Sequence, residues 1–279
     1  GFLFTEAGRA FLRTYLDPRT VIRLGKKRLS IFLEKRYRLH LEEEILDGIF
    51  RACKDAVQLY KSIRQAGQMP FDEELLQADM QWEIDQLERE EQRLLHLENQ
   101  IKTCNQKLDP QDAFLSLPGV QHILAGGIRA CIGDIDRFSS LTKHRGFAGF
   151  YPSVRKTGDG ESASMPISKM SCNRYKRYLY LAAENAYKWD VDCAAFYHKR
   201  REKGHTHTQA VCAVANGKLL SRIHQLLKKL RQAEVNGEHR PRYVFRDLEG
   251  NPISKAEAKA IIQAKWGQRK YGKKGLASS

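Results

Sequence analysis

The sequence predicts a mostly α-helical protein in two parts: a helical linker with a coiled-coil helix, and then a domain that contains a helix–hairpin–helix. Three observations support this fold class. Apolar residues recur at helical spacing through most of the chain, Pro and Gly interrupt them at few points, and one stretch has a seven-residue apolar period. With 279 residues, 42% of them apolar, the chain can form one large domain or two ordinary ones.

Residues 1–71 are predicted to be a helical linker region. Leu29, Phe32 and Leu33 fall on one helical face, and Met69-Pro70 breaks the chain. A further helix is predicted around residues 42–60. Its apolar face consists of Ile45, Ile49, Ala52, Ala56 and Leu59.

Residues 72–109 are predicted to form one long helix with an apolar residue at every seventh position. A second column is mixed, because Leu97 and Cys104 fit it but Glu83 and Glu90 do not. Two structures agree with this pattern: a coiled-coil hairpin or dimer arm, which predicts a homo-oligomer, and an amphipathic helix lying on its own domain. The seven-residue column consists of Met80, Leu87, Leu94, Ile101 and Leu108.

The positive charge lies in the second half of the chain. Residues 141–279 contain 28 Lys and Arg against 11 Asp and Glu, whereas residues 1–140 contain 20 against 22. A basic half of this density favours a polyanion, with duplex DNA first. A solvated surface and a membrane-surface patch are weaker interpretations, because His, Tyr and Asn accompany the cations in place of one broad apolar face.

The remaining composition predicts a cytosolic protein. No apolar run is long enough for a membrane helix, and the six cysteines form no CxxC pair, which indicates scattered reduced thiols. The start at Gly1-Phe2 has no basic region before an apolar stretch, so we expect no signal peptide and a chain cut from something longer.

A domain is predicted over residues 113–266, and it opens with the outline of a helix–hairpin–helix. Gly119 permits a tight hairpin after Pro118, and the helix that follows begins with main-chain N–H groups that can hold a DNA phosphate. Gln121 stands where such hairpins usually have a second glycine. An ordinary connection between helices is the alternative. The residues predicted to contact nucleic acid here are Gly119, Val120, Gln121 and His122.

A second predicted contact surface surrounds residues 146–172, which are rich in Gly, Ser and Pro, and the helix that begins at Asn173. Cations gather there, and phosphate contact is favoured over plain solvated charge. They are Arg155, Lys156, Lys169, Arg174, Lys176 and Arg177.

The remaining elements have weaker signals. Helices are expected at about residues 192–203 and 208–230, a short strand and turn near 243–251, and a disordered basic tail over 267–279. Ser254 and Glu257 form a predicted capping box before a last helix. For Asp134 and Asp136 a helix terminus is favoured over a carboxylate pair, and for His205 and His207 a basic loop is favoured over a metal site.

Several short motifs follow one another in order along the chain: Leu117-Pro118-Gly119-Val120, Ile132-Gly133-Asp134-Ile135-Asp136-Arg137-Phe138, Ala148-Gly149, Pro152-Ser153-Val154-Arg155, Ile167-Ser168-Lys169, and Asn173-Arg174-Tyr175 with Leu179. Their order and spacing resemble the C-terminal domain of the insertion sequence 110/116/902 family of transposases. The segment Tyr243–Asp247 with Gly250 is similar to a C-terminal extension of some members, and the Leu24-Gly25 segment and the coiled coil over residues 72–109 resemble the linker ahead of that domain. The resemblance implies a bacterial cytoplasmic, nucleoid-associated protein.

This resemblance implies an enzyme that cleaves and joins DNA strands by phosphoryl transfer. In the family, an RNase-H-like domain supplies four carboxylates for metal ions, the C-terminal domain supplies a nucleophilic serine, and an RNA of the element guides target choice. The acidic set has no equivalent in residues 1–70, so we expect that domain, and Mg²⁺ with it, only in a longer enzyme. This chain is expected to hold no metal or cofactor by itself.

The family's serine position corresponds here to Thr157, which precedes Gly158. Threonine keeps the hydroxyl but adds a methyl group that crowds attack on phosphorus. Ser162 and Ser164 are the fallback nucleophiles. Two rival functions remain: a non-catalytic DNA- or RNA-binding remnant of a transposase, and a repair-type helix–hairpin–helix protein, which would lack the Pro152–Arg155 motif.

Overall fold

The computed structural model describes residues 5–38, 41–65, 67, 72–150, 171–239, 241–269 and 271. These residues are mostly α-helical, as predicted, and their β-structure is an isolated bridge between Arg246 and Pro252. None of the described helices has the length and apolar character that a membrane span requires. The chain divides into two compact units, residues 1–95 and residues 96–279, which we describe separately.

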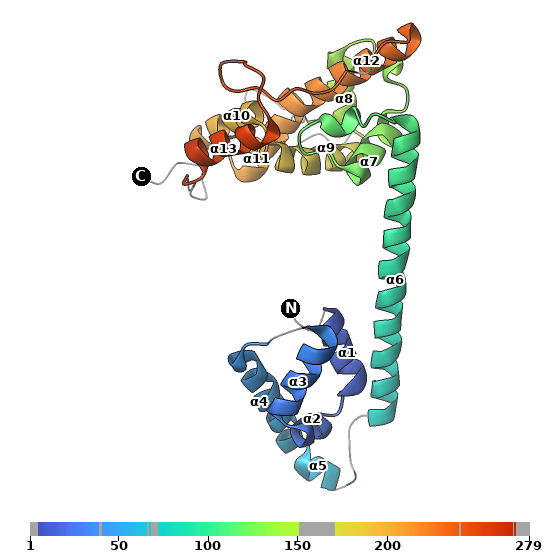
Figure 1. Ribbon diagram of the computed structural model, residues 1–279, viewed down its shortest axis with the longest axis vertical. Coiled ribbons are helices and arrows are strands. Elements are labelled where there is room, and N and C mark those ends of the chain that lie inside the picture. Colours follow the sequence, from blue (N-terminus) through green and yellow to red (C-terminus); the bar gives the residue numbers. More distant parts are fainter. Residues whose placement is uncertain are drawn as a thin grey trace, which may run out of the picture. The chain divides into compact units, whose positions relative to one another are not determined.

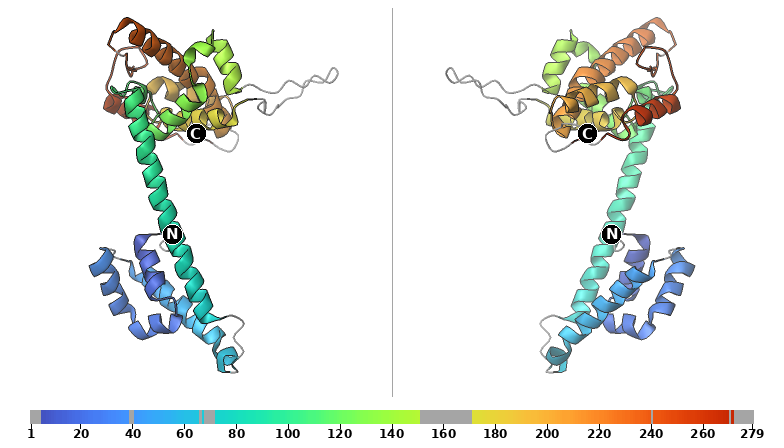
Figure 2. Two further views of the ribbon diagram at one scale, coloured as in Figure 1. Left: turned by 90° about the vertical axis from the view of Figure 1, so that its right-hand side faces the viewer. Right: turned by 90° about the vertical axis from the view of Figure 1, so that its left-hand side faces the viewer.

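The first unit consists of short helices around an apolar core (Figures 1 and 2). Thr5 and Asp17 cap the first two helices, since each side chain accepts a hydrogen bond from a first-turn N–H. The core residues are Phe11, Val21, Leu29, Leu33, Leu41, Leu46 and Phe50. The helices are α1 (Glu6–Thr14), α2 (Pro18–Leu24), α3 (Lys26–Tyr37), α4 (Glu43–Leu59), α5 (Lys61–Gln65) and the start of α6 (Glu73–Leu108).

Helix α6 is one unbroken helix of 36 residues, as predicted for residues 72–109. Its seven-residue column is largely exposed in the single chain: Leu87 is 39%, Leu94 59% and Leu108 62% exposed. Ile84, outside that column, is 5% exposed. The exposure leaves the column available to a partner helix, and the coiled coil stays a prediction.

The second unit packs its helices around a larger core (Figure 1). Helix α9 is central to it, because α7, α8, α11 and η4 all contact it. The elements are η2 (Phe114–Ser116), α7 (His122–Ile132), η3 (Ile135–Arg137), α8 (Leu141–Ala148), α9 (Asn173–Ala186), α10 (Val191–Glu202), α11 (His207–Val214), η4 (Ala215–Leu219), α12 (Leu220–Asn236) and α13 (Lys255–Trp266).

Several boundaries differ from the predictions. The division between the units falls inside α6 and not at residues 109–113, because the end of α6 packs on the second unit: Asn105 is 5% exposed and its Nδ2 donates to the His122 carbonyl over 2.6 Å. The helix predicted for 208–230 continues to Asn236 and includes a π-turn, η4, at residues 215–219. The strand predicted near 243–251 is only the isolated bridge, while the Ser254 capping box is confirmed.

Candidate nucleic-acid interface

The hairpin at residues 117–120 requires glycine at position 119. Gly119 has φ +76°, and a Cβ on it would overlap the Ala182 carbonyl oxygen and lie 2.6 Å from the Ala186 nitrogen. The hairpin therefore rests directly on the backbone of α9, where small residues admit it. The element before the hairpin is the 3₁₀ turn η2, a single turn instead of a full helix.

Helix α7 begins immediately after the hairpin. Gln121 occupies its N-cap and is exposed, and its side chain makes no capping hydrogen bond. The first-turn N–H groups of a helix have no acceptor inside that helix, and they lie at the positive end of its dipole. Close packing fixes α7 against α9, since a Cβ on Gly127 would lie 2.6 Å from the ring of Tyr178. The start of α7 is thus a rigid platform beside the hairpin.

The cations at the start of α9 differ in exposure, because the helical period places one of them near the buried face and the others on the solvent face. Tyr175 and Leu179 are fully buried, which turns Arg174 and Arg177 to the solvent. Lys176 is half-buried, and burial lowers the pKa of its ammonium group. Two of the three predicted cations are therefore exposed on the outer face of the helix.

The residues that flank the segment 151–170 lie side by side. Helix α8 ends at Gly149, which is left-handed with φ +69°, and a Cβ there would overlap Ser171 and lie 3.5 Å from Cε of Lys176. Six predicted site residues lie in that segment, outside the described residues. They are the hydroxyl candidates Thr157, Ser162 and Ser164 and the cations Arg155, Lys156 and Lys169.

Three polar side chains of α8, α9 and α12 form a buried hydrogen-bonded row. His144 of α8 is fully buried, with Nε2 2.7 Å from the Tyr175 hydroxyl and Nδ1 3.1 Å from Nδ1 of His224. Burial, with His224 and Arg137 nearby, lowers the pKa of His144 to about 4. The imidazole is therefore neutral at neutral pH and joins α8, α9 and α12 by hydrogen bonds.

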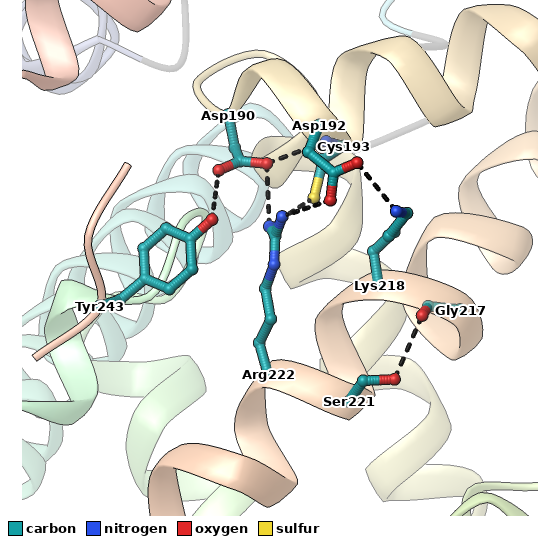
Figure 3. Close-up of polar contacts among 8 residues, drawn as sticks. All are labelled: Asp190, Asp192, Cys193, Gly217, Lys218, Ser221, Arg222 and Tyr243. Atoms are coloured by element: carbon teal, nitrogen blue, oxygen red, sulfur yellow. Dashed lines mark hydrogen bonds and ion pairs between the residues drawn. The ribbon is translucent and has the colours of Figure 1, made fainter. Parts of the chain in front are cut away.

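A second buried network centres on Asp190, the N-cap of α10 (Figure 3). Its carboxylate is 1% exposed and accepts from Nη1 of Arg222 at 2.8 Å, from the Tyr243 hydroxyl at 2.6 Å and from the Cys193 N–H at 2.8 Å. Burial would raise the pKa of Asp190, but Arg222 and the two other donors lower it below its usual value. Arg222 also reaches Asp192, 2.7 Å from its Nη2, and Asp192 pairs with Lys218 at 2.8 Å.

This network was not predicted from the sequence. A helix was expected to begin near Asp192, although an aspartate directly before an apolar helical run, as at Asp190, is an N-cap signal. The pairing with Arg222 has no sequence signal, because 32 residues and a π-turn separate the partners. The network fastens the segment after residue 240 to the body of the second unit.

The weaker candidates have structural roles. Asp134 caps η3, as a helix terminus would, and Asp136 pairs with Lys228 at 2.6 Å and with Arg231. His207 begins α11, and its Nδ1 lies 2.8 Å from the Tyr197 hydroxyl. No group of three or more His, Cys, Asp or Glu side chains in the described part of the chain is placed to hold a metal ion.

The hairpin, α7, α8, the start of α9 and α10 fall in a region with known relatives. Residues 111–198 match the model of the Transposase IS116/IS110/IS902 family. A stretch of 109 residues is 32% identical to the uncharacterized 42 kDa protein of insertion element IS900 from Mycobacterium paratuberculosis, and the match covers 39% of this chain and 27% of that protein. Residues 111–198 are therefore similar to the transposase domain of the IS116/IS110/IS902 family, and the chain spans about a quarter of the length of the insertion-element protein it matches.

Proposed function

We propose that residues 96–279 hold duplex DNA by its phosphate backbone as part of an insertion-sequence transposase. The observation that carries the proposal is two groups of phosphate donors on the second unit: the start of α7, which lies with the hairpin near Ala182 toward the end of α9, and the cations at the start of α9. One helix offers first-turn N–H groups beside the hairpin, and the other offers the exposed guanidinium groups of Arg174 and Arg177. Both donor types bind phosphate oxygens without reading bases, so this contact has little sequence preference.

The phosphoryl-transfer step is assigned in this proposal to a hydroxyl of the segment 151–170, with Thr157 first and Ser162 and Ser164 as alternatives. The hydroxyl oxygen would bond to phosphorus while the bond from phosphorus to the departing sugar oxygen breaks, and the sugar oxygen takes up a proton. The support is that the residues flanking this segment, Gly149 and Ser171, lie side by side, close to Lys176. A cation there would offset the negative charge that develops on the phosphorane oxygens.

Mg²⁺ is implied by the family resemblance, but the described residues do not provide a site that fits it. No step of the proposal therefore passes through a metal ion in this chain. If the transfer requires Mg²⁺, its ligands come from elsewhere, and we propose that this chain by itself binds DNA without forming a covalent adduct.

DNA binding is tested by fluorescence anisotropy with a labelled duplex over a series of salt concentrations. Each phosphate contact contributes about 0.9 to the slope of log affinity against log salt, so a multi-contact surface predicts a steep slope. Replacing Arg174 and Arg177 together with Gln should reduce that slope by up to about 2. Lys229→Gln, an exposed cation of α12, is the matched control. A flat salt dependence contradicts the proposal.

The chemistry is tested on a denaturing gel that detects a protein–DNA adduct. The chain alone is expected to give none, and a longer enzyme with the metal-binding domain is expected to give one that Thr157→Ala removes. An adduct that survives Thr157→Ala moves the assignment to Ser162 or Ser164. In the longer enzyme Thr157→Ser should raise strand transfer, because it deletes the crowding methyl group.

The proposed partners beyond DNA are a guide RNA of the same element and a second copy of the chain through α6. Competition between duplex DNA and structured RNA in the same anisotropy assay addresses the first. If the longer enzyme binds nucleic acid tightly but never forms an adduct, the non-catalytic nucleic-acid-binding role replaces the enzymatic one.

A further inference from the structure

A groove of about 700 Å³ runs beside the hairpin on the side of residues 241–255. Its floor is apolar, and two of its residues remain notably exposed: Ile123 is 45% and Leu181 38% exposed. One wall is the hairpin with the start of α7, and the other contains Trp189, Arg242 and Lys255. The groove belongs entirely to the second unit.

The far wall is fixed in place by Tyr243. Its N–H donates to the Ser116 hydroxyl at 2.7 Å and its own hydroxyl donates to Asp190 at 2.6 Å (Figure 3). The following turn closes through the Ile253 N–H and the Phe245 carbonyl at 2.9 Å. These hydrogen bonds hold the segment 243–253 against η2 and the start of α10.

The charged side chains that line the groove are all positive. Among the described residues its lining includes Arg242 and Lys255, both exposed, and no Asp or Glu. Lys255 and Lys259 of α13 lie over the Trp189 ring, with their Nζ atoms 4.8 and 4.9 Å from its centre. An indole with two ammonium groups over its ring suits an anionic ligand, and an aromatic group of that ligand can stack on the indole when the flexible lysine side chains turn toward its negative charge.

The walls also contain two exposed amide side chains, Gln121 and Asn185. An amide donates and accepts hydrogen bonds, so it pairs with the edge of a nucleobase. In a duplex the flat faces of the bases are covered by their neighbours, whereas an unpaired base can stack on an aromatic side chain. A volume of about 700 Å³ lies within the range of small-ligand sites and suits one or two nucleotides.

We propose that this groove binds an unpaired nucleotide of single-stranded DNA, with the base against Trp189 and the flanking phosphates on Arg242 and Lys255. The inference rests on the proposed DNA-holding function and adds a site for a strand that has left the duplex. In this proposal the groove binds single-stranded DNA, whereas Arg174 and Arg177 bind duplex DNA. Variants of one site should therefore leave binding at the other site intact.

The test compares oligothymidine of about 16 nucleotides with a duplex of the same length, at about 0.2 M salt, by anisotropy. Trp189→Leu should weaken binding of the single strand about tenfold and leave duplex affinity within about twofold. Trp189→Phe, which keeps a stacking ring, should restore most of the affinity. Binding of the single strand should also quench tryptophan fluorescence in the wild type and not in Trp189→Phe.

Two exposed substitutions keep the test decisive if a change at Trp189 disturbs folding. Arg242→Gln with Lys255→Gln should weaken the single strand more than Lys229→Gln does. The groove assignment would be overturned, with duplex binding unaffected, by either of two results. One is an equal loss of single-strand affinity in the groove double variant and in Lys229→Gln, and the other is unchanged single-strand affinity in Trp189→Leu. Loss of all duplex binding in the wild type would instead overturn the proposed function. Tighter, Trp189-dependent binding of oligouridine would overturn the assignment to DNA in favour of RNA.

Discussion

The two units use charged residues in different ways. Residues 1–95 contain 16 Lys and Arg against 17 Asp and Glu, and several pair across helices: Arg9 with Glu91 at 3.0 Å, and Arg13 with Glu88 at 3.0 Å. Residues 96–279 contain 32 against 16. The first unit is close to neutral, and the second has twice as many cations as carboxylates.

Four carboxylates of the second unit are engaged by donors of the same unit. Asp190 is buried among three donors, Asp192 and Asp136 pair with cations, and Asp109, 3% exposed, accepts from the Phe114 N–H at 2.7 Å. These four serve caps and local ion pairs, so they do little to offset the exposed cations of α9 and α13. This difference indicates that the second unit, and not the first, meets a polyanion.

The largest expected effect contrasts an internal ion pair with a surface one. Arg222→Ala leaves the Asp190 carboxylate buried without its charge partner and should cost about 3–5 kcal/mol of unfolding free energy. Arg13→Ala removes an exposed pair, with side chains 35% and 41% exposed, and should cost less than about 1 kcal/mol.

Urea denaturation of both variants against the wild type measures the contrast. Arg222→Met, which keeps apolar packing, serves as the control for lost side-chain volume and should remain strongly destabilised. Similar losses for Arg222→Ala and Arg13→Ala would remove the distinction between the units.

The next effect contrasts two glycines of positive φ. Gly119→Ala forces a methyl group into the backbone of α9 and adds left-handed strain, which together should cost about 2–4 kcal/mol. Gly25 in the first unit has φ +81° and ψ 154°, a conformation that is nearly restricted to glycine, but nothing lies within 4 Å of a Cβ, so Gly25→Ala should cost only the backbone strain of about 1–3 kcal/mol. Thermal denaturation measures both, and equal costs would mean that the hairpin moves away from α9 without penalty.

The glycine contrast shows how far the sequence could be interpreted. A tight turn at Gly119 was predictable from Pro-Gly-Val, because that signal is local, and so were α6 and the Ser254 cap. What Gly119 touches was not predictable, because Ala182 lies 63 positions later in the chain. The same limit hid Arg222 beside Asp190 and the groove at Trp189, each of which joins segments far apart in sequence.

An intermediate effect concerns α6, which contributes to both units. Leu87 and Leu94 are 39% and 59% exposed, and burying such side chains between two copies would stabilise a dimer. Changing both to Gln should lower the mass seen in sedimentation from a dimer to a monomer, with circular dichroism unchanged. Leu75→Gln, at a 61% exposed leucine outside the column, is the control and should leave the mass unaltered. A wild-type monomer at all concentrations would favour α6 as an intramolecular helix.

The smallest expected effect is the response of the two units to mild acid. In the second unit, burial lowers the pKa of His144 and of His198 to about 4, against 6.5 when unfolded. Between these values the unfolded chain binds protons that the folded chain does not, so stability is lost as the pH falls from about 6.5 to about 4. Residues 1–95 contain one histidine, His40, which lies outside the described residues, and none is buried in the described part, so the first unit should lose less stability over this window.

Calorimetry from pH 7 to pH 4 should therefore show the transition of the second unit moving down by several degrees while that of the first moves less. His144→Gln keeps a hydrogen-bonding side chain without a titrating ring and should flatten the pH dependence of the second unit. At still lower pH the Asp190 carboxylate adds to the decline, because its lowered pKa means that the unfolded chain takes up this proton more readily than the folded chain does. Equal shifts of both transitions would mean that acid acts through general charge repulsion, and that the buried histidines do not set the difference between the units.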